Sequence, residues 1–415
     1  MKILYDNCCG IDVHKKLLVC CFIQGKKQET KNFGATTTEI LKLADWLAAG
    51  NCQMVAMEST GSYWKPLYNI LESAELKAIV VNAQHMKAVP GRKTDVSDAA
   101  WIADLLQHGL LKASYIPNKE QRELRELVIY RKSLVSEKGR ELNRLQKMLE
   151  GANIKLSGTV SRILGKSSRN LLEYVLNGGK ITEDVLIKLQ EEKKIASQLK
   201  ASYSQLAEDM NGVLTRLQCR MLKEVLSHID ELNAHIANLD DEIDTNMTDG
   251  QKRAVEAIDN IPGIAKDTAK GIIAYIGTEM KRFPSAAHIA SWAGVCPGNN
   301  ESAGKRKSGR TNKGNNYVKS ALVVCAHAAS RVKSSYFSAL FQRLSIRRGK
   351  KRAYLAVAHS LLIAIYHVLK NNENYKDLGA DYFTKFNVER KIKSYLKKLT
   401  ELGWDGDITS LRAQQ

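Results

Sequence analysis

The sequence lacks two widely recognised site patterns. No two cysteines stand in C-x-x-C spacing, and the nucleotide-binding pattern G-x-x-x-x-G-K-[ST] is absent. The first absence disfavours a zinc site, and the second excludes a P-loop. The eight cysteines include two adjacent pairs, Cys8 with Cys9 and Cys20 with Cys21, in apolar strand-like stretches. We therefore expect them to be small core residues in a protein of the reducing cytosol.

Long apolar runs are also missing. The longest, residues 353–369, is interrupted by His359, Ser360 and His367 and falls short of a membrane span. It predicts a buried helix instead. The first nine residues contain an Asp and an Asn where a secretory signal would be apolar. We therefore expect a cytoplasmic protein without a membrane partner.

Positive charge is what the sequence has in excess. Its 415 residues hold 63 Lys and Arg against 44 Asp and Glu, a formal net charge of +19. Phosphate backbones attract such a surface through counterion release, which favours nucleic acid over an acidic lipid surface or a merely soluble basic surface. Hydrophobic residues make up 44% of the chain, enough for real cores, and the length predicts two or three domains.

Residues 1–115 alternate strand-like and helix-like segments, which predicts an α/β sheet with parallel strands. Thr94 is the expected N-cap of the last helix in this region. The strand candidates are residues 10–23, 53–57 and 78–81, and the helix candidates are residues 38–49, 63–74 and 95–107.

Residues 116–250 have the pattern of long helices. Residues 120–149 form one charged amphipathic helix, and a later stretch has apolar residues in steps of three and four. Such a seam is typical of a long helix packing on its own domain or of a coiled coil that pairs protomers. We favour the coiled coil and expect a dimer. The seam comprises Leu222, Val225, Ile229, Leu232, Ile236, Leu239 and Ile243, extended backwards by Leu206, Met210, Val213 and Leu217.

Residues 251–375 are predicted to form a third, mostly helical region, followed by a polar tail, 376–415, with one helix near 388–402. Within residues 257–277, a helix, the sequence IPGI and a second helix resemble a helix-hairpin-helix. Such a hairpin offers backbone N–H groups, at Gly263 among others, to a phosphate. Ala265 stands where a second glycine is usual. An ordinary helical turn is an equally good interpretation.

Four carboxylates in the N-terminal region have the spacing of a metal site. Asp12 lies at the start of a strand candidate and Glu58 directly after another, while Asp95 and Asp98 share one face of a helix. Such oxygen ligands suit Mg²⁺ or Mn²⁺, and two ions about 4 Å apart support phosphoryl transfer. Taken one at a time, each carboxylate has an equally good structural explanation, such as a favourable interaction with a helix dipole or an ion pair with a lysine. His14, two residues after Asp12, is read as a structural histidine in preference to a ligand.

A second candidate site lies in the polar, glycine-spaced stretch 297–316. A loop with glycines for close backbone approach and cations for charge is typical of phosphate binding. Ser302 lies beside this cationic segment and is a candidate nucleophile, although a serine in a turn is usually structural, and Ser308 competes on the same terms. The cations are Lys305, Arg306, Lys307, Arg310 and Lys313.

Together these segments resemble the DEDD transposases of insertion sequences, the one-ten family. The N-terminal likeness lies in GIDVHK, MESTGSYW and KTDVSDAAWIADLL, which contain the four carboxylates. The C-terminal likeness lies in IPGI, FPSAAHIASWAGVCPG and ESAGKRKSGRTNKGN. The likeness runs from about residue 8 to about residue 370.

The resemblance implies an RNase H/RuvC-like fold for the N-terminal region and a C-terminal transposase domain. Asp12, Glu58, Asp95 and Asp98 would bind Mg²⁺. Ser302 matches the family's nucleophile, which attacks a DNA phosphodiester and leaves a covalent phosphoserine link. Lys305 and Arg310 would hold the non-bridging oxygens.

The resemblance also implies the partners. These are DNA at the element ends and at the target, a structured guide RNA from the element, and further copies of the chain in a dimer or tetramer. In that assembly one subunit's carboxylates meet another's serine. The expected location is the nucleoid of a bacterial or archaeal cell.

Three other functions remain open. A site-specific DNA invertase of a related group shares the same residues. A RuvC-like junction nuclease hydrolyses DNA with water and leaves Ser302 unused. A basic, dimeric nucleic-acid-binding protein would keep the carboxylates as structural residues and show no Mg²⁺-dependent cleavage.

Overall fold

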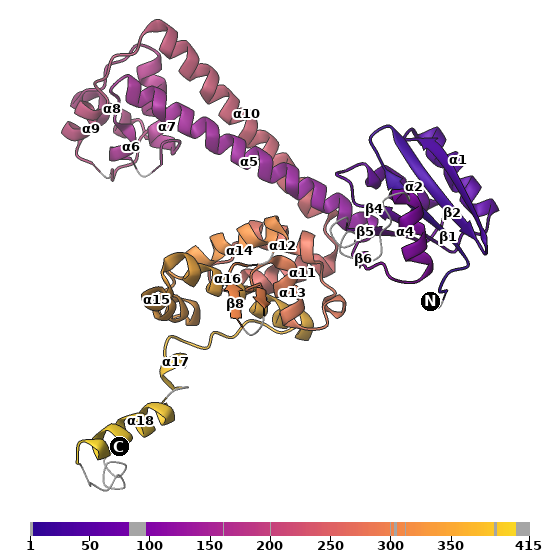
Figure 1. Cartoon of the computed structure of the whole chain (residues 1–415). Coiled ribbons are helices and arrows are strands. Elements are labelled where there is room, and N and C mark those ends of the chain that lie inside the picture. The colour runs from indigo at the N-terminus through magenta and orange to yellow at the C-terminus, as the bar shows by residue number, and fades with distance from the viewer. Residues whose placement is uncertain are drawn as a thin grey trace. The chain divides into compact units, whose positions relative to one another are not determined.

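The computed structural model forms two compact units, Met1–Asn118 and Lys119–Gln415, which are described separately (Figure 1). The structure describes residues 3–82, 97–160, 162–199, 201–298, 300–302, 305–311, 313–385 and 388–403.

The N-terminal unit is built on a mixed sheet with the strand order β3-β2-β1-β4-β5-β6. β1, β4 and β5 are parallel neighbours, whereas β2, β3 and β6 pair antiparallel. The strands are β1 (Asn7–Val13), β2 (Leu17–Gln24), β3 (Lys27–Gly34), β4 (Met54–Glu58), β5 (Ala78–Val81) and β6 (Ala113–Ser114). The six-stranded mixed sheet is consistent with an RNase H-like domain.

The α/β sheet with parallel strands predicted from the sequence is confirmed for β1, β4 and β5, while the other strands pair antiparallel. The candidate strand at 10–23 is two strands of a hairpin, joined by three residues. Such a short connection can join only antiparallel strands, because a parallel pair needs a long crossover. Asp12 consequently lies near the end of β1 and not at the start of a strand.

Helices cover both faces of this sheet (Figure 1). α1 (Thr37–Ala49) and α2 (Trp64–Ser73) pack on the face that carries Ile11 and Met57. α4 (Asp98–Gln107) packs on the opposite face. The first two helices and β5 confirm the segments predicted from periodicity.

The predicted start of the third helix is wrong. α4 begins at Asp98, because Ser97 is its N-cap, with an extended backbone (φ −58°, ψ 146°) and a side chain that accepts a hydrogen bond from the Ala100 N–H. Thr94 and Asp95 themselves lie outside the described residues.

Two long helices dominate the second unit. α5 (Lys119–Gly151) and α10 (Arg216–Asn246) run antiparallel: the start of α5 meets the end of α10 where Arg131 bonds Asp240, and the other ends share a core that contains Leu149 and Leu222 (Figure 1). The helix predicted at 120–149 is thereby confirmed.

The heptad seam lies on α10 and is buried within the chain. Leu222, Val225, Ile229, Leu232 and Ile243 are buried, while the seam residues between them are half-buried. Packing on its own domain thus accounts for the seam, and the pairing of protomers stays a prediction.

The backward extension of the seam is wrong. Val213 and Leu217 are 81% and 68% exposed. Thr215 and Gln218 form a capping box that starts α10 at Arg216, so Val213 precedes the helix and Leu206 belongs to an earlier one, Tyr203–Asp209. A small lobe closes this end of the pair with α6 (Leu156–Thr159), α7 (Lys166–Leu176), α8 (Glu183–Glu191) and α9 (Tyr203–Asp209).

The C-terminal helices pack around α16 (Lys350–Asn371). This helix confirms the buried helix predicted at 353–369, since Val357, Leu361 and Ile365 are fully buried. Among the described helices, α16 alone is long and apolar enough to cross a membrane by length and composition, and its packing explains that composition. The surrounding helices are α11 (Asp249–Asp259), α12 (Lys266–Ile276), η1 (Met280–Arg282), α13 (Ala286–Ala293), α14 (Asn316–Ala329) and α15 (Tyr336–Arg348).

The remaining elements are two short strands and two tail helices. They are β7 (Asn300–Ser302), β8 (Lys305–Ser308), α17 (Tyr382–Lys385) and α18 (Val388–Glu401). The last confirms the tail helix predicted from the sequence.

The cysteines confirm their predicted role as core residues. All eight are free thiols, and five are buried, four of them on β1 and β2. Burial raises the pKa of Cys8 to about 12 and that of Cys52 to about 11, because an apolar environment disfavours the thiolate. These two thiols therefore stay protonated at neutral pH.

Candidate active site

Two carboxylates lie at the carboxyl ends of adjacent parallel strands. Ile11 of β1 is in register with Met57 of β4, so Asp12 and Glu58 occupy the next position on each strand. Ile11 and Met57 pack against α1 and α2, and side chains alternate along a strand. Asp12 and Glu58 therefore point to the other face, the one covered by α4.

α4 brings a third carboxylate to the same end of that face. The Leu4 N–H donates to the Gln107 carbonyl at the end of the helix, and Gly10 lies against Ala99 and Ala103 further up it. The helix therefore runs antiparallel to β1, with its N-terminus beside the end of the strand. Asp98 is the first residue of α4.

Gly10 permits this close packing. A Cβ atom at this position would lie 2.3 Å from the Ala103 nitrogen and 2.4 Å from the Ala99 oxygen, both backbone atoms that cannot move aside singly. The glycine of the GIDVHK segment thus sets the distance between β1 and the helix that carries Asp98.

Asp12 has a histidine partner. The His14 Nε2 atom lies 3.0 Å from Asp12 Oδ2, with the histidine side chain 56% exposed and the aspartate 15% exposed. His14 lies in the turn between β1 and β2, where its N–H donates to the Leu17 carbonyl. This contact orients the Asp12 carboxylate, and the structural role of His14 stays a prediction.

The three carboxylates are of the chemical type that binds divalent cations. Asp12, Glu58 and Asp98 supply hard oxygen donors of the type that Mg²⁺ and Mn²⁺ prefer. Over the ranges that the structure describes, no group of three or more His, Cys, Asp or Glu side chains is close enough to hold a metal ion. Asp95 lies outside those ranges, so binding by all four carboxylates stays a prediction.

The segment predicted as a phosphate-binding loop contains a β-hairpin. β7 and β8 pair antiparallel, with Ser302 opposite Lys305 and Ser308 opposite Asn300. Two residues separate the strands in the sequence, the length typical of tight hairpins. Ser302 is thus the last residue of β7, next to the hairpin tip.

The base of the hairpin is fixed to α13. Pro297 bridges Thr311, and the Gly298 N–H donates to the Arg310 carbonyl. A Cβ atom on Gly314 would lie 2.3 Å from the Gly294 nitrogen, which follows α13. Arg310 and Lys313 are exposed beside this base.

The IPGI segment joins α11 to α12 by a tight turn. Gly263 has φ +87°, and a Cβ atom there would lie 2.4 Å from the Ala329 nitrogen at the end of α14. The packing of this unit therefore requires a glycine at this position, and this requirement holds independently of the proposed phosphate contact. Ala265 is the N-cap of α12 and provides no side-chain cap.

Comparisons with known proteins match both halves of this arrangement. A family model described as "Transposase", of the DEDD type of IS110, matches residues 9–154. A second, described as "Transposase IS116/IS110/IS902 family", matches residues 255–342. The chain belongs to the IS110 family of transposases.

A curated relative supports the assignment. The 43.6 kDa protein of insertion element IS110 from Streptomyces coelicolor is 24% identical over 387 residues, which cover 85% of this chain and 90% of the relative. The transposase is thus a DNA recombinase, and its family implies DNA binding. DEDD transposases generally use divalent metal ions.

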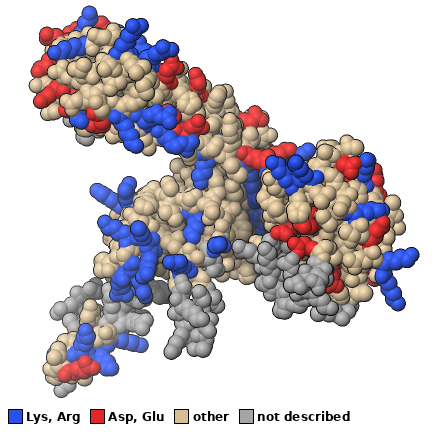
Figure 2. All heavy atoms as spheres, turned by 45° about the horizontal axis from the view of Figure 1, so that its top comes forward, with Lys and Arg blue, Asp and Glu red and all other residues tan. Residues whose placement is uncertain are grey.

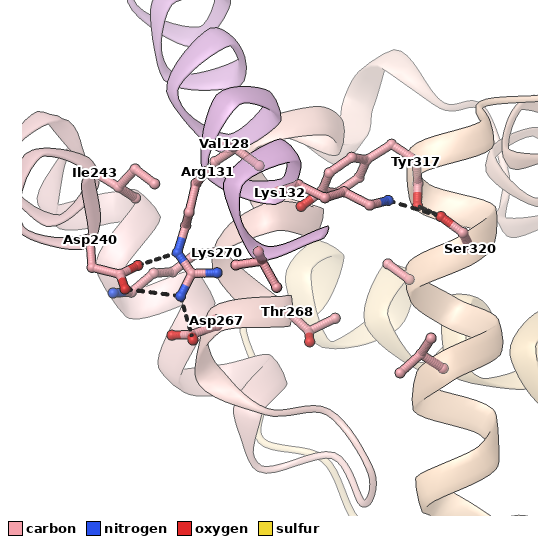
Figure 3. Close-up of a pocket in the computed structure, with 13 residues that line it drawn as sticks. Val128, Arg131, Lys132, Asp240, Ile243, Asp267, Thr268, Lys270, Tyr317 and Ser320 are labelled. Carbon is pink, nitrogen blue, oxygen red and sulfur yellow. Dashed lines mark hydrogen bonds and ion pairs between the residues drawn. The ribbon is translucent and has the colours of Figure 1, made fainter. Parts of the chain in front are cut away.

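Sequence reasoning missed a pocket in the second unit of the transposase. A cavity of about 350 Å³ lies where α5, α10, α12 and α14 meet (Figure 3). Arg131 bonds Asp240 of α10 and also Asp267 of α12, the latter at 2.8 Å, and hydrogen bonds to Asp240 raise its pKa. Lys132 points the other way and donates to the Ser320 hydroxyl at 3.1 Å (Figure 3).

No local signal reveals this pocket, because its walls come from four separate helices, of which α5 is more than a hundred residues from the others in the sequence. Burial lowers the pKa of Lys132, whose ammonium lies 4.2 Å from the centroid of the Tyr317 ring. The charged residues here tie α5 to α10 and α12, which is a structural task.

Sequence reasoning also passed over a basic turn between α15 and α16. Figure 2 shows Lys and Arg side chains gathered over the C-terminal helices. The run RRGKKR at 347–352 was a readable signal. Six exposed cations lie within ten residues at this turn: Arg343, Arg347, Arg348, Lys350, Lys351 and Arg352.

Proposed function

We propose that this IS110-family transposase cuts and rejoins DNA through a covalent bond to Ser302, with a divalent metal ion held by Asp12, Glu58, Asp95 and Asp98. One observation carries the proposal. Asp12, Glu58 and Asp98 come from three separate elements and lie at one end of one face of the sheet. Asp12 and Glu58 are half-buried on neighbouring strands, so a cation would offset the cost of placing two like charges there, and Asp98 is exposed at the same end.

The carboxylates' task is to bind and orient. Asp12 and Glu58 extend from the ends of rigid strands, and His14 orients the Asp12 carboxylate from the neighbouring turn. A bound Mg²⁺ or Mn²⁺ ion would supply charge stabilisation at the reacting phosphate. Gly10 keeps α4, and with it Asp98, close to this end of β1.

Ser302 would provide the nucleophile. Its Oγ atom forms a bond to phosphorus, the bond from phosphorus to one sugar oxygen breaks, and that oxygen leaves with the electron pair and takes up a proton. The serine proton passes to solvent. A free sugar hydroxyl of another strand then attacks the phosphoserine and restores the serine. The ester conserves the phosphodiester energy, so no nucleotide cofactor is needed.

The basic residues around the hairpin would bind the nucleic acids. Element-end and target DNA and an element-encoded guide RNA are the proposed partners, and a homodimer or tetramer would bring carboxylates and serine together. Exposed Arg310 and Lys313 support this assignment. The proposed phosphate contacts are Lys305, Arg306, Lys307, Arg310, Lys313 and the backbone at Gly263.

The serine is tested by trapping the adduct. The full chain is incubated with labelled element-end DNA, the adjacent element RNA and Mg²⁺, and protein–DNA adducts are separated on denaturing gels. We expect Ser302→Ala to abolish the adduct and leave DNA binding within about twofold. Ser308→Ala, on the other strand of the same hairpin, should retain it. An adduct at wild-type level in Ser302→Ala, or strand cleavage without any adduct, would overturn the proposal.

The carboxylates are tested in the same assay with a matched pair on α4. Asp98→Asn at the start of the helix should reduce the adduct at least about 100-fold, because one oxygen ligand loses its charge. Asp104→Asn, where the wild-type side chain is exposed and pairs with His108, should leave adduct formation unchanged. Equal losses in both variants would contradict a site at this end of the sheet.

A further inference from the structure

The three polar residues that interrupt the apolar C-terminal run line one pocket. His359, Ser360 and His367 of α16 face a cavity of about 530 Å³, closed by the start of α15 and by the segment that follows α16. His359, Ile363 and His367 are spaced four apart, so they form one stripe on the helix. The volume is in the range of small-molecule and base-binding sites.

Aromatic rings form one wall of this pocket. Phe337 and Tyr375 stack with their centroids 5.8 Å apart at an interplanar angle of 16°, and Tyr336 lies beside them. Asp377 holds the wall together, since it accepts hydrogen bonds from the Tyr336 N–H and from the Tyr375 hydroxyl at 2.9 and 3.2 Å. The rings are thus positioned before any ligand binds.

The same pocket holds hydrogen-bonding groups of α16, of which Ser360 bonds the Tyr336 hydroxyl and His359 is its neighbour in the sequence. Within the described ranges, the Nδ1 atom of His359 is buried and has no hydrogen-bond partner. Burial lowers the pKa of His359, which keeps the ring neutral with one donor and one acceptor. The mouth is polar and exposed, with His367, Asn371, Asn374 and Lys376.

We infer that this pocket binds an unpaired nucleobase of a single DNA strand. A base presents a flat face that stacks on aromatic rings and an edge with donors and acceptors for His359 and Ser360. Lys376 at the mouth is placed for the adjoining phosphate. A transposase acts on strands that separate during exchange, so unpaired DNA bases are present. The pocket shares no residue with the proposed catalytic groups, so the inference is independent of them.

The test uses a single-stranded DNA oligonucleotide with one 2-aminopurine, whose fluorescence reports stacking. The full chain is titrated with it in EDTA. Ala364→Phe, which fills the pocket, should weaken binding about tenfold, the effect expected for one lost base-stacking contact. Ala356→Phe makes the same change at another half-buried position of α16 and should bind as wild type does. Circular dichroism confirms that both variants fold.

Measurements on the unaltered protein keep the inference testable if Ala364→Phe fails to fold. An oligonucleotide with an abasic site in place of the 2-aminopurine should bind about tenfold more weakly. Deoxyadenosine monophosphate should displace 2-aminopurine from the pocket at high concentration, whereas deoxyribose 5-phosphate should not.

Three outcomes overturn the inference. Equal affinities of the intact and abasic oligonucleotides exclude base recognition. Tighter binding of free deoxyadenosine monophosphate than of the oligonucleotide indicates a free-nucleotide site. Tighter binding of an RNA of the same sequence, lost in Ala364→Phe, assigns the pocket to RNA. No adduct forms in EDTA, so failure here leaves the Ser302 proposal untouched.

Discussion

Gly10 is the residue on which the geometry of the carboxylates most directly depends. Gly10→Ala would place a methyl group within 2.4 Å of two backbone atoms of α4. We expect the helix to be displaced, the free energy of unfolding to fall by about 1–3 kcal/mol through overpacking, and the DNA adduct to decrease as Asp98 moves away from Asp12. Urea unfolding and the adduct assay measure the two effects.

Gly139 provides the control for this glycine. It lies within α5, and a Cβ atom at this position would have nothing within 4 Å, so Gly139→Ala should stabilise the protein by about 0.5–1 kcal/mol through helix propensity. Unchanged stability in Gly10→Ala would show that α4 adapts without cost, and the proposed control of Asp98 by this contact would then fail.

Single residues were predicted unequally well. Asp12, Glu58 and Asp98 were identified from their residue types and neighbours, and the structure places all three at one end of a sheet face. The cap of α4 was assigned to Thr94, although Ser97 provides it. Both residue types are good N-caps, so residue type alone does not distinguish the two positions.

At the scale of elements, Arg131 connects three helices. It extends from α5 and bonds Asp240 of α10 and Asp267 of α12, with its own side chain 20% exposed. We expect Arg131→Ala to lower the free energy of unfolding by about 1–3 kcal/mol, because two carboxylates lose a charged hydrogen-bond partner in a partly buried place. Chemical denaturation measures the loss.

An exposed ion pair provides the comparison for Arg131. Lys42 and Glu39 lie on one face of α1, and Lys42→Ala should destabilise the protein clearly less than Arg131→Ala, because solvent screens this pair. Similar losses in the two variants would show that the contacts around Arg131 are no stronger than a surface pair.

The heptad seam shows what periodicity determines about an element. Spacing correctly identified an apolar stripe on a long helix, and Val225, Ile229 and Leu232 are buried. The stripe packs on α5 of the same chain. The spacing does not encode this partner, because apolar side chains at heptad positions pack equally well on any complementary helix. The predicted seam extends too far towards the N-terminus. The helix begins after its N-cap, Thr215, and the spacing of apolar residues does not show where a helix is capped.

At the scale of the whole molecule, the net charge of +19 predicts strongly salt-dependent DNA binding. If the five hairpin-region cations each contact a phosphate, their joint replacement by Gln should reduce the slope of log affinity against log salt by about 4.5. Fluorescence anisotropy with duplex DNA at several NaCl concentrations measures the slope. The replaced residues are Lys305, Arg306, Lys307, Arg310 and Lys313.

The control removes the same charge elsewhere. Five exposed lysines, four in the lobe and one at the adjoining end of α10, should change the slope by less than one unit when replaced by Gln. They are Lys166, Lys180, Lys188, Lys193 and Lys223. Equal slope changes in the two variants would mean that net charge, and not the hairpin, determines DNA binding.

By itself, the sequence determined the net charge and most of the helices, because these depend on residue type and short-range spacing. Only the tertiary structure decided the mixed order of the sheet, the intramolecular partner of the seam and the meeting of His359, Ser360 and Tyr375 around one cavity. Each of these is a contact between distant segments. Local periodicity specifies which side of an element is buried and leaves open what buries it.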